Sequence, residues 1–174
     1  MIYYCDSEVV IRNMTRADVK ALADGEIAQG WGDTTEKHET RLRDQEAGRC
    51  TPLAAEYCGQ AAGYISVYSQ AEHGPFAGTG QPELVDFGVL EKFRRHGIGG
   101  KLMDAAEQLA GEWSSTVGIG VGLHSGYGSA QRMYVRRGYV PDGSGVWFRD
   151  EICPPYGDCR NDDDLVLYMS KKLR

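Results

Sequence analysis

The feature that most constrains the fold is a strand, a basic glycine-rich turn and a helix that follow one another within residues 84–109. The mostly apolar run Leu84–Leu90 predicts a buried strand. After Arg94, apolar residues recur on one face of a predicted helix, at Ile98, Leu102, Met103, Ala106 and Leu109. A helix that begins in such a turn points its first backbone N–H groups and the positive end of its dipole at one place. The segment therefore predicts a binding site for an anion.

The glycine spacing narrows the kind of anion site. A Walker loop needs Gly at position 95 and Ser or Thr at 102, where this chain has Arg95 and Leu102. The dinucleotide fingerprint fails because its third glycine would also fall at 102. The remaining pattern, Arg-x-x-Gly-x-Gly from Arg94 to Gly99, resembles the pyrophosphate-binding motif of GCN5-related N-acetyltransferases. The alternative is a glycine-rich helix start with solvated arginines.

A second segment adds to the resemblance. Ala130, Tyr134, Gly138 and Tyr139 occur at the spacings of that family's second helix motif, in the right order after the first. One departure is Tyr127, because the family often has Asn three residues before the alanine, so this side-chain contact to the cofactor is not carried over. The resemblance implies acetyl-CoA as the acyl donor, held by the backbone of one strand and by the turn, at Phe87, Gly88, Val89, Arg94, Arg95, His96, Gly97, Ile98, Gly99, Gly100 and Lys101.

The other predicted elements fit the same family. Strands are expected at 9–12, 52–58, 61–68, 84–90, 117–123, from 139 and at 165–169, and helices from 15, at 34–47, from 94 and at 129–137. The helix at 34–47 has Leu42 and Ala47 as its only clear apolar residues, so we expect it to be poorly buried. The glycines within 117–123 leave one side of that strand bare, either for the cofactor or for close packing of a helix.

The fold class that the resemblance implies is α/β (α+β). It has a mixed, mostly antiparallel central sheet, a splayed parallel strand pair formed by 84–90 and 117–123, and flanking helices. With 174 residues, the chain is expected to form a single domain over 1–174.

Composition bounds the partners and the compartment. The net charge of −6 disfavours binding to nucleic acid. Neither a signal peptide nor a membrane-spanning run is recognisable, so a cytoplasmic location is expected. The five cysteines indicate neither a complete disulfide framework nor a zinc site, and Cys153 and Cys159 are expected to be reduced loop cysteines. Relatives are often homodimers, and the sequence leaves the oligomeric state open.

The resemblance also assigns catalytic roles. Tyr134 lies at the family's general-acid position and would protonate the departing thiolate, although an aromatic residue there could equally belong to the core. Glu83 and Asp86 are candidates for the base that takes the proton of the amine, as are His124 and a water chain. For the carboxylates, the alternative is a capped or solvated side chain.

The leading expectation for the acceptor is a primary amine of a small cationic molecule, and a protein acceptor and a non-catalytic reading are the alternatives. A small cationic amine fits the net charge and the acidic run Asp162, Asp163 and Asp164, which could bind it or could be a solvated turn. A protein N-terminus or lysine is the second acceptor. The third reading is an acyl-CoA sensor without chemistry, against which the presence of Tyr134 speaks. The acyl chain length cannot be deduced.

Overall fold

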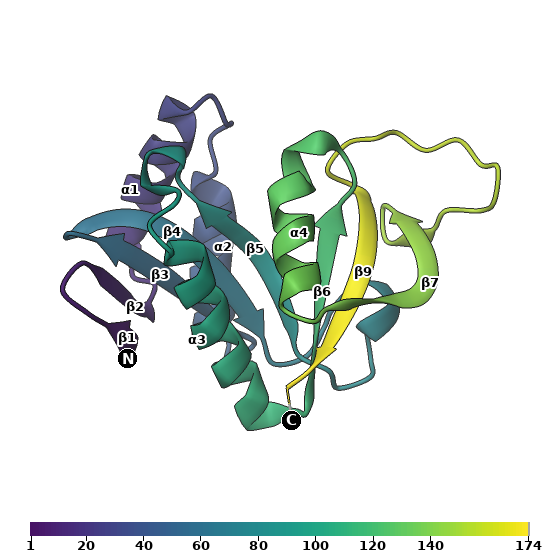
Figure 1. Cartoon of the computed structure of the whole chain (residues 1–174), viewed down its shortest axis with the longest axis horizontal. Helices are drawn as coiled ribbons and strands as arrows, with labels where there is room; N and C mark the ends of the chain where they lie inside the picture. The colour runs from purple at the N-terminus through teal and green to yellow at the C-terminus, as the bar shows by residue number, and fades with distance from the viewer. Residues whose placement is uncertain (174) are drawn as a thin grey trace. The chain divides into compact units, whose positions relative to one another are not determined.

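The computed structural model describes residues 1–173, and it divides into two compact units (Figure 1). The first unit contains Met1–Ser69 and Leu84–Leu109, and the second contains residues 70–83 and 110–173. Within the described part of the chain, no helix has the length and apolar character needed to cross a membrane. The single domain remains a prediction.

The first unit is built on a sheet with the strand order β1-β2-β3-β4-β5. These strands are β1 (Ile2–Cys5), β2 (Val9–Asn13), β3 (Cys50–Tyr57), β4 (Gln60–Tyr68) and β5 (Glu83–Val89). Neighbours from β1 to β4 pair antiparallel, and the strands predicted at 52–58 and 61–68 form as the hairpin of β3 and β4. Strand β1 was not predicted, because its residues show no clear alternation of apolar and polar side chains.

Three helices complete this unit: α1 (Arg16–Ala28), α2 (Thr35–Glu46) and α3 (Ile98–Trp113), whose last four residues belong to the second unit. Helix α1, predicted from residue 15, begins with a capping box, in which the Thr15 N–H donates to the Asp18 carboxylate at 2.7 Å. The helix predicted at 34–47 forms as α2, but the expectation that it is poorly buried is wrong. Helix α2 packs against β3 and α1 and buries His38, Leu42 and Asp44. Two of these side chains are polar, and their burial is possible because each is hydrogen-bonded.

The second unit has the strand order β6-β9-β7-β8, formed by β6 (Thr116–Gly122), β9 (Leu165–Lys172), β7 (Val140–Phe148) and β8 (Glu151–Ile152). All three neighbouring pairs are antiparallel. Helix α4 (Gly128–Arg136) follows a short 3₁₀ turn after β6. The predicted fold class, mixed with mostly antiparallel strands and flanking helices, is confirmed. The two strands predicted as a parallel pair form as β5 and β6, one in each unit.

Side chains of the second unit pack on the bare side of β6, which explains its glycines. A Cβ built on Gly118 would lie 2.5 Å from the Phe76 ring, and one built on Gly122 would lie 2.3 Å from the Tyr127 ring. Gly120 faces β9 in the same way. Of the two readings, close packing therefore accounts for these glycines, although the packing elements are single side chains and not a helix.

The prediction of reduced cysteines in the loop after β8 is wrong for this structure. Cys153 and Cys159 are joined in a disulfide across a separation of six residues. Their spacing lacks a recognised motif, so contact of the two cysteines across the loop was the less favoured alternative. Cys5, Cys50 and Cys58 are free thiols.

Candidate functional site

The predicted anion-binding turn forms between β5 and α3. Two of its residues have left-handed backbones, Arg95 with φ 67° and Gly97 with φ 74°, and they turn the chain sharply into the helix. The Lys101 N–H donates to the Gly97 carbonyl oxygen at 3.2 Å, so the helix ladder begins one turn after the first N–H groups. A Cβ built on Gly100 would meet no heavy atom within 4 Å, so packing does not require a glycine there. A side chain at this position would keep an anion away from the backbone. The glycine is therefore compatible with phosphate binding by the turn.

The basic side chains of the turn have different surroundings. Arg94 is half exposed, lies 3.3 Å from the Glu91 carboxylate and donates through Nε to the Val89 carbonyl oxygen at 3.4 Å. Arg95 is exposed. His96 stacks on Tyr57, with 4.6 Å between the ring centroids. Both arginines are thus near the surface, where they could reach a phosphate group.

Two predicted cofactor residues are held by the protein itself. Ile98 is buried, so only its backbone is available to a ligand. The Lys101 ammonium forms an ion pair with Asp6 and donates to the Tyr4 hydroxyl at 2.8 Å. The Lys101 hydrogen bond is also the main cause that holds the pKa of Asp6 well below its usual range. Lys101 therefore connects the β1–β2 hairpin to α3.

The strand segment Phe87–Val89 lies on a support made by Tyr64 of β4. A Cβ built on Gly88 would lie 2.8 Å from both Cζ and the hydroxyl oxygen of Tyr64, so only glycine fits. The buried Tyr64 hydroxyl donates to the carboxylate of Glu26 and accepts from the Lys37 ammonium at 2.7 Å. The backbone that was predicted to bind the donor thus rests on a fixed side chain.

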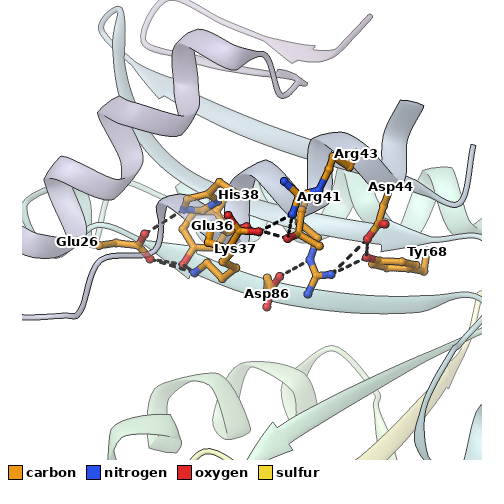
Figure 2. Close-up of polar contacts among 11 residues, drawn as sticks. Glu26, Glu36, Lys37, His38, Arg41, Arg43, Asp44, Tyr68 and Asp86 are labelled. Atoms are coloured by element: carbon orange, nitrogen blue, oxygen red, sulfur yellow. Dashed lines mark hydrogen bonds and ion pairs between the residues drawn. The ribbon is translucent and has the colours of Figure 1, made fainter. Parts of the chain in front are cut away.

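Glu26 is the centre of this buried group, and its side chain is 0% exposed (Figure 2). His38 Nε2 lies 3.0 Å from Glu26 Oε2, and Thr34 donates to the same oxygen. Burial alone would raise the pKa of Glu26, but the hydrogen bonds from His38, Thr34 and Tyr64, together with the charge of Lys37, lower it to about 2. The sequence did not indicate this cluster, because its members are spread over α1, α2 and β4.

A second polar group on the same side of α2 reaches Asp86 of β5 (Figure 2). Arg41 Nε donates to Asp86 Oδ2 at 2.5 Å, and Arg41 Nη1 donates to the Tyr68 hydroxyl at 2.6 Å. The Tyr68 hydroxyl in turn donates to Asp44. Asp86 was predicted as a candidate base and is instead found in an ion pair that sequence reasoning missed.

In the second unit, Tyr134 is a buried residue of α4. Its ring lies 5.8 Å from that of Tyr139, centroid to centroid. Burial, followed by the charge of Tyr127, raises the pKa of Tyr134 well above its ordinary value. The phenol is therefore protonated throughout the physiological pH range, as a proton donor must be.

Glu83, a candidate for the base that takes the proton of the amine, is also buried in the second unit. Its charge, after burial, contributes to a raised pKa of about 12 at Tyr168 of β9, which places the carboxylate near that phenol. The Tyr168 ring also fills the space beside Gly74, where a Cβ would lie 2.2 Å from the ring. The loop before β5 is thus packed onto β9 next to Glu83.

The acidic run before β9 is occupied by partners within the unit. His124 Nε2 lies 2.9 Å from Asp163 Oδ1, and the Tyr127 hydroxyl donates to the same oxygen at 2.8 Å. These hydrogen bonds lower the pKa of Asp163. Asp162 lies 3.5 Å from the Arg160 guanidinium, and Asp164 lies 3.5 Å from that of Arg149.

His124, another candidate base, has both ring nitrogens engaged. Its Nδ1 accepts a hydrogen bond from the Gly126 N–H at 3.1 Å, so the proton of the neutral ring lies on Nε2 and faces Asp163. No lone pair of this ring is directed at solvent or substrate.

Comparison with known proteins identifies the class. The family model described as acetyltransferase (GNAT) family matches residues 19–139, which is more than half of the chain. The chain therefore belongs to the GNAT family of acetyltransferases, and the expected activity class and donor, acetyl-CoA, are confirmed. A search of curated proteins found no match.

Several solved structures share the fold. An acetyltransferase from Salmonella typhimurium that modifies the N-terminal serine of ribosomal protein L7/L12 is 11% identical, with a TM-score of 0.73 and 99% of each chain covered. The Salmonella typhimurium protein yncA, solved with its cofactor acetyl-CoA, is 17% identical, with a TM-score of 0.67 and coverage of 97% of this chain and 95% of that one. A ribosomal-protein-alanine N-acetyltransferase from Brucella melitensis is 23% identical, with a TM-score of 0.66 and coverage of 93% and 98%.

Proposed function

We propose that this acetyltransferase transfers the acetyl group of acetyl-CoA to a primary amine, with Tyr134 as the general acid. The observation that carries the proposal is the buried phenol of Tyr134, whose pKa is raised by burial. A thiolate that leaves in the same water-poor surroundings is also destabilised, so a proton held on the phenol is a favourable donor to it.

The donor is bound by the turn between β5 and α3 and by the backbone of Phe87–Val89. The turn supplies helix N–H groups and the exposed side chains of Arg94 and Arg95, which together neutralise a pyrophosphate. A backbone N–H near Val89 stabilises the negative charge that develops on the thioester carbonyl oxygen as the amine attacks.

The proton of the attacking amine passes to Glu83 or to a water chain. Glu83 is a candidate because it is a buried carboxylate at the start of β5, the strand whose backbone is proposed to bind the donor. Asp86 is less suited, since one of its oxygens already accepts the hydrogen bond from Arg41.

Two acceptor classes follow from different observations. A small cationic amine is supported by the net charge of −6. A protein N-terminus or lysine is favoured by the pairing of Asp162, Asp163 and Asp164 with neighbouring side chains, because carboxylates with partners attract an additional cation weakly. The fold shared with acetyltransferases of ribosomal proteins is compatible with the second class.

Release of the free CoA thiol from acetyl-CoA, measured with each amine of a panel, tests the proposal. The panel contains spermidine, an aminoglycoside, and peptides with a free N-terminal serine or an internal lysine. We expect amine-dependent thiol release by the wild type and none by Gly99→Glu, which places a negative side chain in the first turn of α3. Thiol release that no amine accelerates would contradict the proposal, and the amine with the highest kcat/KM identifies the acceptor class.

A further inference from the structure

Asp86 has an unusual conformation for a residue inside a strand. It is a non-glycine residue with φ 55°, and it lies directly before Phe87–Val89, the segment proposed to bind the donor. Left-handed backbone at a non-glycine residue costs free energy and is retained where surrounding contacts fix it. Here the contact is the ion pair from Asp86 Oδ2 to Arg41 Nε at 2.5 Å.

Arg41 is itself fixed on other sides. Its Nη1 donates to the Tyr68 hydroxyl at 2.6 Å and lies 3.5 Å from Asp44 Oδ2, while Asp44 is also paired with Arg49 (Figure 2). Desolvation disfavours the charge of Arg41, but the hydrogen bond that Arg41 donates to Asp86, together with the nearby negative charges, raises the pKa of Arg41. The guanidinium therefore holds a single orientation and a permanent charge.

One oxygen of Asp86 remains available. Arg41 occupies Oδ2, and among residues 1–173 the structure gives Oδ1 no hydrogen-bond donor. The Asp86 side chain is 21% exposed, so Oδ1 can be reached from outside. Two carboxylates, Asp44 and Asp86, balance two guanidinium groups in this cluster. Oδ1 is therefore suited to accepting a directed hydrogen bond more than to attracting a distant cation.

We propose that Asp86 orients the acceptor by accepting a hydrogen bond from its amine N–H on Oδ1, and that Arg41 is the positioning residue that fixes the carboxylate. The hydrogen bond turns the amine toward the thioester, which would be bound by the next residues of the strand, and leaves proton removal to another group. This inference rests on the proposed function, because it assumes an amine acceptor beside the Phe87–Val89 backbone.

Helix α2 makes this arrangement rigid. His38 and Lys37 bind Glu26, and Glu26 and Lys37 hold Tyr64 against Gly88, while Arg41 of the same helix holds Asp86. The residue that orients the acceptor and the backbone that binds the donor are thus supported by one helix, two residues apart on β5. A displacement of α2 would move both groups together.

Carboxyl-carbon NMR of protein labelled with ¹³C-aspartate, saturated with CoA, tests the inference directly. The Asp86 resonance is assigned by its loss in Asp86→Asn, a change that a left-handed position tolerates. We expect n-butylamine hydrochloride to shift this resonance and tetramethylammonium chloride, which has no N–H, to leave it unchanged. The shift should be lost in Arg41→Gln and kept in Arg43→Gln, the matched control on the same helix, whose exposed side chain pairs with Glu36.

Kinetics with the amine identified in the panel separate a positioning role from a structural one. In Arg41→Gln we expect KM for the amine to rise about 10-fold, because a hydrogen bond to a charged group contributes roughly that factor. CoA affinity should be unchanged, and Arg41→Lys should recover part of the loss. A lower stability of Arg41→Gln with unchanged KM would assign Arg41 a purely structural role and overturn the inference.

The two proposals fail differently. The wild type could acetylate amines while its Asp86 resonance does not shift on addition of butylamine. That result would overturn the inference and leave the proposed function intact. A resonance that responds as expected, in a protein whose thiol release no amine accelerates, would overturn the proposed function and support amine binding at Asp86.

Discussion

At the scale of single residues, the environment decides which of several similar side chains can take part in chemistry. Asp86, Asp163 and His124, which were singled out from the sequence, are hydrogen-bonded to neighbouring groups. Tyr134 and Glu83 are buried, and burial raises the pKa of the Tyr134 phenol. In the proposed mechanism, Tyr134 gives a proton to the thiolate and Glu83 is a candidate to take one from the amine.

The Tyr134→Phe variant tests the acid. The substitution keeps the ring in its buried position and removes only the hydroxyl, so CoA binding and the circular dichroism spectrum should remain those of the wild type. We expect kcat to fall about 100-fold, which is a typical contribution of a general acid. Steady-state thiol release between pH 6 and pH 10 measures this, and a Phe variant that is fully active over that range would remove Tyr134 from the mechanism.

At the scale of elements, polar contacts fix the position of helix α2. It buries His38 and Asp44, and in Figure 2 its Lys37 and His38 side chains reach Glu26 while Arg41 reaches Asp86. A buried carboxylate with several donors stabilises the fold only while it is ionised. The position of α2 should therefore depend on pH.

The pH dependence of unfolding tests this. The pKa of Glu26 is lowered from 4.5 to about 2, so its contribution is fully present above pH 4.5 and is lost as the pH falls toward 2. Between pH 7 and pH 3, we expect the free energy of unfolding of the wild type to fall by about 2 kcal/mol more than that of Glu26→Gln, which has no charge to lose. Urea titrations of both proteins give the difference. Parallel decreases would show that Glu26 is not linked to acid unfolding.

The elements differ in how far the sequence could predict them. The turn from Arg94 to Gly100 and the helix with Tyr134 are encoded by local sequence patterns, so residue spacing alone was sufficient to predict these two elements. The buried face of α2 was not predictable, because burial of His38 and Asp44 depends on partners in α1 and β4 that are distant in sequence. The ion pair of Asp86 was not predictable for the same reason. Its ion pair with Arg41 joins residues 45 positions apart.

At the scale of the whole molecule, 25 acidic and 19 basic side chains give a net charge of −6. Such a charge concentrates cationic substrates around the protein and does so less as salt is added, because screening acts over about 8 to 10 Å at physiological ionic strength. The acidic run before β9 contributes half of that charge in formal terms, yet each of its carboxylates has a partner.

The triple variant Asp162→Asn/Asp163→Asn/Asp164→Asn separates steering from local structure. If the run attracts the acceptor, kcat/KM for spermidine should fall in the variant and should depend less on salt than in the wild type. Donor affinity should not change. Stopped-time thiol release at 20 mM and 300 mM NaCl measures both quantities. Equal kinetics in the two proteins at low salt would reduce the run to a structural turn held by His124, Tyr127 and the two arginines.

The link from Lys101 to Asp6 and Tyr4 gives the turn that is proposed to bind phosphate a counterion of its own. A lysine whose charge is already compensated releases no ion into solution when a phosphate arrives, so it adds little to the salt dependence of donor binding. That dependence should then reflect mainly Arg95, because Arg94 is itself paired with Glu91. Asp6→Asn would deprive Lys101 of its ion-pair partner, and the variant would gain a further uncompensated cation at the turn and, with it, affinity for any polyanion.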